Sequence, residues 1–142
     1  MVETLRNIII NAPVEKVFAY LDDPIRLLEW MTNMKEIKNV SGSGVGSHFR
    51  WVYEMIRKRF EGEATVVDHI PNKKIVIQLK GDISGSLSLI FGPHDGGTMV
   101  TSIYKYSVPI QVGGKAAEKL VMTLNEKEMD LDIASIKVKL DD

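Results

Sequence analysis

The sequence predicts an α+β domain in which a long terminal helix covers one face of an antiparallel sheet. Residues 115–140 contain neither Pro nor Gly and repeat apolar residues at helical spacing. Residues 48–108 instead alternate apolar and polar positions between short turn-forming segments. The chain has 142 residues, the length of one ordinary domain, so we expect a single domain over residues 1–142.

The composition excludes several classes of protein. Lys and Arg total 18 against 19 for Asp and Glu, so the balance of charge gives no reason to expect a nucleic-acid partner. The absence of Cys excludes disulfides, thiol nucleophiles and cysteine metal sites. No stretch approaches the roughly 18 apolar residues of a membrane span, and no signal-peptide pattern is present. We therefore expect a cytoplasmic protein without a transmembrane segment.

The first elements are predicted to be one strand followed by two short helices. Residues 5–10 are rich in Ile, and Pro13 suits the first turn of a helix that Asp23 ends before Pro24. A second short helix starts near Pro24, and the bulky side chains of this part of the chain are Leu27, Leu28, Trp30, Met31 and Met34.

The middle of the chain is predicted to form antiparallel strands. Residues 35–47 are interpreted as a glycine-containing turn that leads into the clearest strand, residues 49–55. The basic residues 57–59 would turn the chain back into residues 60–68. With residues 74–80, 83–91 and 98–108, this gives about five consecutive strands joined by hairpin turns.

The long helix carries two apolar stripes. The first, which we expect to be buried, consists of Ala117, Leu120, Val121 and Leu124, and Leu131 and Val138 continue it. The second lies roughly opposite at about 100° per residue and consists of Met129, Ile133, Ile136 and Leu140. The helix therefore either bends or is apolar on two sides. Thr123 and Glu126 could cap a new start near Asn125, or could stand in mid-helix by chance.

No sharp catalytic motif is present. His48, His69 and His94 do not lie at metal-ligand spacing, and the chain has neither a His-Glu-x-x-His nor a Gly-x-Ser-x-Gly pattern. The glycines of residues 42–47 lack the ending of a phosphate-binding loop. We predict no metal and no cofactor.

Met and aromatic residues are frequent on elements that should face inward. Such side chains can line a pocket for apolar ligands, although an ordinary core has the same composition. The candidates are Trp30, Met31, Met34, Trp51, Tyr53 and Met55. Gln78, Tyr104 and Tyr106 are polar groups on strands that could orient a ligand.

The chain resembles the START-like superfamily and, more narrowly, its polyketide cyclase/dehydrase and lipid transport group, often called SRPBCC. The resemblance covers nearly the whole chain and is carried by Ala12-Pro13-Val14 with Val17-Phe18, Asp23-Pro24, Trp30, Gly44-x-Gly46-x-x-Phe49, Pro71-x-x-Lys74 and Gly97-Thr98-x-x-Thr101.

This resemblance implies the helix-grip fold, a curved antiparallel sheet of about seven strands around a long C-terminal helix, with two short helices after the first strand. It also implies an apolar cavity between helix and sheet for lipids, sterols, quinones or polyketides. Positions implied to line it are Trp30, Trp51, Tyr53, Leu120, Leu124 and Glu128. The family shares no single catalytic constellation, so the fold supplies no active site.

Three functions remain open from the sequence. The first is the binding of a small hydrophobic molecule in the cavity. The second is a cyclase or dehydratase in which Tyr53, Tyr104 or Glu128 guides proton transfer. The third is an interaction module in which the second apolar stripe of the helix binds another subunit, which would give a homodimer.

Overall fold

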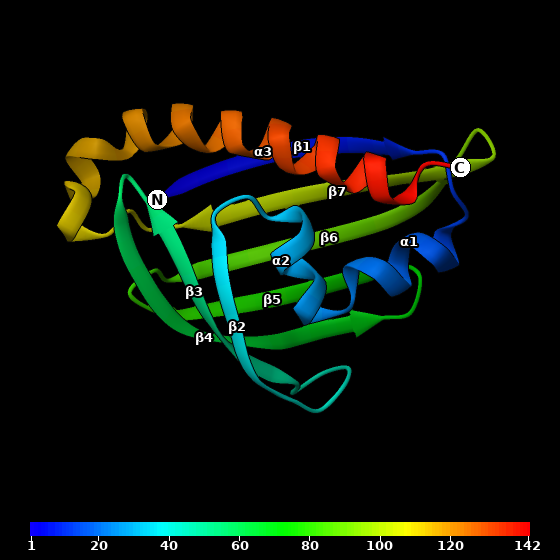
Figure 1. The fold of residues 1–142 in the computed structure, drawn as a ribbon, viewed down its shortest axis with the longest axis horizontal. Helices are drawn as coiled ribbons and strands as arrows, with labels where there is room; N and C mark the ends of the chain where they lie inside the picture. The colour runs from blue at the N-terminus through cyan, green and yellow to red at the C-terminus, as the bar shows by residue number, and fades with distance from the viewer.

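The protein, described over residues 1–142 by a computed structural model, consists of one seven-stranded antiparallel sheet, three α-helices and short 3-10 turns (Figure 1). The elements are β1 (Val2–Ile10), α1 (Val14–Leu21), η1 (Pro24–Arg26), α2 (Leu27–Trp30), β2 (Met34–Ser41), β3 (His48–Met55), β4 (Lys58–Ile70), β5 (Lys74–Gly81), β6 (Gly85–His94), β7 (Gly97–Tyr106), η2 (Ile110–Val112), η3 (Gly114–Ala117) and α3 (Glu118–Leu140).

The strands follow the order β1-β7-β6-β5-β4-β3-β2, so each strand from β2 onward pairs with its neighbour in sequence and β1 closes the order beside β7. The pairing of β4 with β5 shifts between Val66 and Asp68, and such bulges bend a strand. Figure 1 shows α3 running along the curved sheet beside β1 and β7, with α1 and α2 on the same side. The predicted helix-grip fold is confirmed.

β2 was not expected from the sequence. Residues 34–41 form the edge strand paired with β3, whereas residues 35–47 were predicted to form a turn and Met34 to belong to the second short helix. The strand shows no clean alternation because most of its side chains are exposed or half-buried, and Asn39 has a φ of 55°. A sequence pattern built on one buried face therefore had nothing to detect.

α3 is a single helix from Glu118 to Leu140, without a break at Asn125. The Thr123 hydroxyl donates to the Lys119 carbonyl at 3.1 Å, which is a mid-helix bond and not a cap. The helix is therefore unbroken and carries apolar side chains on two sides.

The two stripes of α3 are exchanged relative to the prediction. The second stripe faces the sheet, because Met129, Ile136 and Leu140 are buried. In the first stripe only Val121 is buried, whereas Leu120 is 59% exposed and Val138 is 83% exposed. The buried residues recur at steps of three and four and are Val121, Asn125, Met129, Asp132, Ile136 and Leu140. The stripe predicted to bind another subunit is therefore part of the core.

Polar contacts fix α3 over the edge of the sheet. The Lys137 ammonium donates to the Ile9 carbonyl at 2.6 Å, and an Asp141 carboxylate oxygen accepts from the Asn11 backbone amide at 2.8 Å. These contacts lie at the C-terminal end of the helix, close to the end of β1. No helix of the structure has the length and apolar character needed to cross a bilayer.

The orientation of α3 predicts which substitutions destabilise the fold. Ile136 is 2% exposed, so Ile136→Ala should lower the free energy of unfolding by about 2–5 kcal/mol through lost burial and a residual cavity. Val138→Ala on the opposite side should change it by less than about 0.5 kcal/mol. Urea denaturation of both variants measures this difference, and equal losses would show that α3 does not face the sheet in this way.

Candidate functional site

A cavity of about 90 Å³ lies on the inner face of the sheet, next to α2 and to Asn125 of α3. Thirteen of its fifteen lining residues are hydrophobic, and none is Lys, Arg, His, Asp or Glu. The lining residues are Leu27, Met31, Met34, Phe49, Trp51, Tyr53, Met55, Ile77, Leu79, Ile83, Ser86, Leu87, Tyr104, Tyr106 and Asn125.

The alternation of β3 supplies one wall of this cavity. Trp51, Tyr53 and Met55 are two residues apart, so their side chains project from the same face of the sheet. Trp51 pairs with Gly62 of β4, and a Cβ atom at Gly62 would lie 2.6 Å from the Trp51 ring. Glycine therefore allows the indole to lie against the neighbouring strand.

A second, larger cavity of about 270 Å³ adjoins the first. It lies between η1 and the loop at residues 42–47, and Trp30 is part of its wall. Leu27, Phe49, Ile77 and Leu87 line both cavities. These shared side chains form the partition between the two spaces.

The shortest polar contact near the first cavity joins Tyr53 to Glu128. The Tyr53 hydroxyl donates to Glu128 Oε2 at 2.6 Å. Burial raises the pKa of the Glu128 carboxyl, while the Tyr53 hydrogen bond opposes that increase. Burial and the adjacent Glu128 carboxylate raise the pKa of Tyr53, which therefore stays protonated at neutral pH.

A second buried carboxylate holds the loop between α2 and β2 against α3. Asp132 Oδ1 accepts from the Thr32 backbone amide at 2.8 Å and from the Thr32 hydroxyl at 2.7 Å. Burial raises the pKa of Asp132, and the two bonds from Thr32 counteract it. Because Met31 and Met34 flank this loop and line the cavity, α3 also fixes that part of the wall.

Two buried polar atoms of the cavity wall have no protein partner. The Tyr106 hydroxyl and the Trp51 indole nitrogen are buried without a hydrogen bond. Asn125 Oδ1 accepts from the Thr4 hydroxyl at 3.2 Å. Tyr104 is half-buried near Asp132 and Glu128, and desolvation together with these carboxylates raises its pKa. Since an indole N–H only donates, a hydrogen-bond acceptor is the group that would satisfy it.

The structure brings together seven of the side chains predicted to contact a ligand. Those that line the first cavity are Met31, Met34, Trp51, Tyr53, Met55, Tyr104 and Tyr106. Trp30 lines the second cavity instead. Leu124 is half-buried on α3, outside both walls.

Two predicted positions lie elsewhere. Gln78 is exposed on the outer face of β5, because its neighbours Ile77 and Leu79 both face the cavity. Leu120 is exposed because α3 is rotated relative to the prediction. The placement of both residues in the cavity was therefore wrong.

Sequence reasoning missed Asn125 and Asp132. Both are polar residues on the buried stripe of α3, and a search for apolar residues passes over them. Asn125 follows Val121 by four residues, and Asp132 follows Met129 by three. This helical spacing was the available signal that both lie on the buried side of α3. No group of three or more His, Asp and Glu side chains is arranged so that it could hold a metal ion.

Comparison with known proteins gives one family and several similar folds. The family model described as "Polyketide cyclase / dehydrase and lipid transport" matches residues 1–141. No curated protein matches the chain.

Three solved structures illustrate the similarity of fold. TTHA0849 from Thermus thermophilus has a TM-score of 0.76 at 22% identity, covering 96% of this chain and 94% of that one. The Aha1 dimer from Colwellia psychrerythraea has a TM-score of 0.66 at 22% identity, covering 99% of this chain and 97% of that one. The di-domain ARO/CYC StfQ from the steffimycin biosynthetic pathway has a TM-score of 0.75 at 11% identity. The match covers 96% of this chain and 49% of that one.

The raised pKa of Glu128 predicts a specific pH dependence of stability. A carboxyl whose pKa is raised by folding contributes most to the free energy of unfolding at pH values below its unfolded pKa. That contribution is lost as the pH rises through the folded pKa. The stability of Glu128→Gln relative to the native protein should therefore increase between pH 4 and pH 7.

Urea denaturation at both pH values measures this difference. Glu126→Gln, at an exposed position of the same helix, is the control and should show no such trend. A constant difference between Glu128→Gln and the native protein would contradict the burial of this carboxylate.

Proposed function

The chain belongs to the polyketide cyclase / dehydrase and lipid transport family, and on this premise we propose that it binds a small hydrophobic molecule between the sheet and α3. Lipids, quinones and polyketide-like compounds are the expected chemical classes. The observation that carries the proposal is the internal cavity, whose wall consists almost entirely of apolar side chains.

The size of the ligand follows from the two adjoining cavities. About 90 Å³ is smaller than a cavity of about 150 Å³ that holds benzene, whereas drug-sized ligands occupy about 300 Å³ or more. We therefore expect the ligand to extend into the neighbouring space of about 270 Å³. Met31 and Met34 are unbranched and flexible, so they can change rotamer to admit it.

The charge of the ligand follows from the polar groups. The wall contains unpaired donors at Tyr106 and Trp51 but no cationic side chain. The carboxylates of Glu128 and Asp132 lie near Tyr53 and Tyr104 but are not part of the wall. An anion would lose its hydration without gaining a counter-charge. A neutral molecule with an oxygen acceptor fits this wall better than a carboxylate.

Matched probes test this proposal. Equilibrium dialysis should show 2-acetylnaphthalene, a neutral ketone, binding at least about tenfold more tightly than 2-naphthoate, a difference of about 1.4 kcal/mol. Met34→Trp should fill part of the cavity and weaken ketone binding by about tenfold. Leu131→Trp, at an exposed position on α3, should leave it unchanged.

Thermal melts of both variants establish that they fold. Equal binding of the ketone by Met34→Trp and the native protein would place the ligand outside the cavity. Mass spectrometry after gentle extraction of the purified protein identifies any molecule that it retains.

A second candidate function is proton transfer within a bound polyketide-like substrate, as in a cyclase or dehydratase. The contact between Tyr53 and Glu128 favours it. We propose that the Tyr53 hydroxyl, which lines the cavity, gives its proton to the Glu128 carboxylate while its oxygen takes a proton from the carbon between two carbonyls, and that the electron pair moves onto a carbonyl oxygen. Once Glu128 is protonated, the Tyr53 hydroxyl is free to donate to that enolate oxygen. Return of the proton completes the cycle.

Hydrogen exchange at carbon tests this second function. In D₂O, the native protein should accelerate the exchange of the C2 protons of 1-phenyl-1,3-butanedione for deuterium. NMR measures the rate of this exchange. Glu128→Gln should reduce the acceleration by about 10²-fold or more, and Glu126→Gln should not. Exchange at the rate of buffer alone would remove the catalytic function and leave ligand binding untouched.

The homodimer and the cytoplasmic location remain predictions. The Colwellia psychrerythraea neighbour is a dimer, which supports the idea of a second subunit here. Its contact surface would differ from the one expected from the sequence, because that stripe is buried. The exposed strip of α3 at Leu120, Leu131 and Val138 is the apolar surface that the helix offers instead.

A further inference from the structure

Two connections meet at one end of the molecule and form what we call the end surface. It comprises the turn at residues 56–58, between β3 and β4, and the segment at residues 107–119, between β7 and the first turn of α3. The Lys58 ammonium donates to the Gln111 carbonyl at 2.8 Å, so the two connections are in contact. Figure 1 shows the tip of the β3–β4 hairpin beside the start of α3.

Isoleucines project from both connections into solvent. Ile110 is 89% exposed, more than any other large hydrophobic side chain of the protein, and Ile56 is 43% exposed. Ile56 and Arg57 occupy the turn with φ values of 50° and 59°. β-Branched residues rarely adopt positive φ, so the backbone here presents an apolar side chain where a turn normally carries a polar one.

The end surface is basic although the whole chain has a formal net charge of -1. Its exposed cations are Arg57, Lys58, Lys115 and Lys119, and none of them forms an ion pair. Glu118 is the only acidic residue in these two connections, and it pairs with the amino terminus at 3.0 Å. Positive charge is therefore concentrated around the two isoleucines.

The end surface adjoins the ligand cavity. Met55, the residue before the β3–β4 turn, and Tyr106, the last residue of β7, both line that cavity. A partner on this surface would thus lie next to the space in which a hydrophobic molecule would bind.

We propose that the end surface docks on an anionic phospholipid membrane, with Ile110 and Ile56 inserted at the boundary between headgroups and acyl chains. Basic residues around an apolar tip are the combination that binds anionic lipid surfaces. The inference does not depend on the identity of the ligand in the cavity.

Sedimentation with lipid vesicles tests the proposal on the full chain. The native protein should bind vesicles of phosphatidylcholine with about 30% phosphatidylserine far more tightly than vesicles of pure phosphatidylcholine. Each Lys or Arg that contacts the anionic surface should raise the affinity roughly fivefold. Ile110→Ser and the double variant Arg57→Glu/Lys115→Glu should each reduce binding to the anionic vesicles by tenfold or more.

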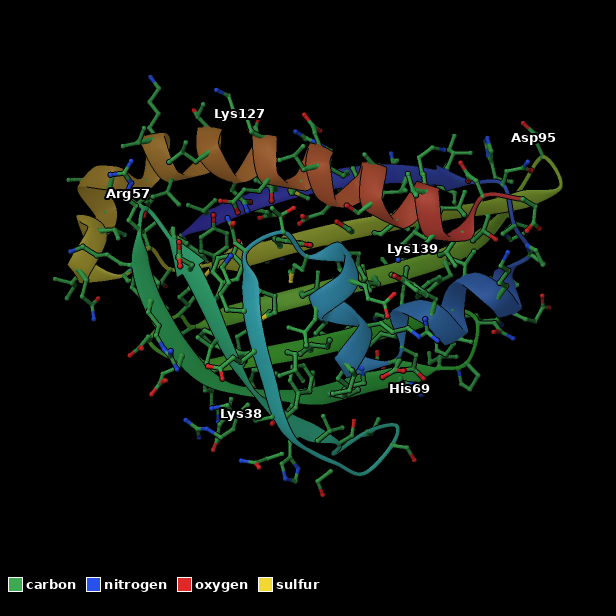
Figure 2. The ribbon with its side chains drawn as sticks, viewed as in Figure 1. Lys38, Arg57, His69, Asp95, Lys127 and Lys139 are labelled. Atoms are coloured by element: carbon green, nitrogen blue, oxygen red, sulfur yellow. The ribbon has the colours of Figure 1, made fainter.

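Matched controls come from the rest of α3. Val138→Ser removes an apolar side chain that is 83% exposed, and Lys127→Glu/Lys139→Glu reverses two exposed lysines. Figure 2 shows Arg57 at the end of the molecule where α3 starts, and Lys139 toward the other end. Both controls should keep the vesicle binding of the native protein. Thermal melts verify that every variant folds.

Three outcomes would overturn the proposal. The first is no vesicle binding by the native protein, as expected if a protein partner uses this surface. The second is equal binding to neutral and anionic vesicles, and the third is an equal loss of binding in the control variants.

Dialysis of the same variants against 2-acetylnaphthalene without vesicles separates the two functions. Ketone binding without vesicle binding refutes only the docking surface, whereas vesicle binding without ketone binding refutes only the cavity proposal.

Discussion

The burial of one stripe of α3 against the curved sheet is the constraint on which the rest of the structure depends. That stripe is not purely apolar, because Asn125 and Asp132 alternate in it with Val121, Met129 and Ile136. The apolar members anchor the helix, and the polar members find partners on Thr4 of β1 and Thr32 of the loop after α2. The helix therefore holds the sheet edge and the small helices together while leaving space beside Asn125.

The same arrangement sets the electrostatics of the interior. On the sheet side of α3, Asp132 is buried and Glu128 is half-buried, so the loss of hydration raises the pKa of each carboxyl. Their negative charge in turn raises the pKa of the Tyr104 hydroxyl, which burial has already raised. The interior combines protonated tyrosines with carboxylates and contains no cation in the cavity wall. Neutral ligands and proton transfer are both consistent with that combination.

The sequence predicted the elements with strong periodicity and failed where the signal was weak. The alternation of β3 correctly placed Trp51, Tyr53 and Met55 on one face. β2 escaped detection because an edge strand with exposed side chains has no apolar period. The rotation of α3 could not be derived from its sequence, since two apolar stripes compete and the buried one includes Asp132. Leu120 was therefore assigned to the cavity, and Asn125 was overlooked.

The central claim is that an apolar ligand enters the space between the sheet and α3. Methyl ¹³C NMR of the methionines tests it directly, because Met31, Met34 and Met55 line that space while Met1 and Met99 do not. Titration with 2-acetylnaphthalene should shift the three cavity signals and leave Met1 and Met99 in place. Shifts confined to Met1 and Met99, or none at saturating ligand, would contradict the account.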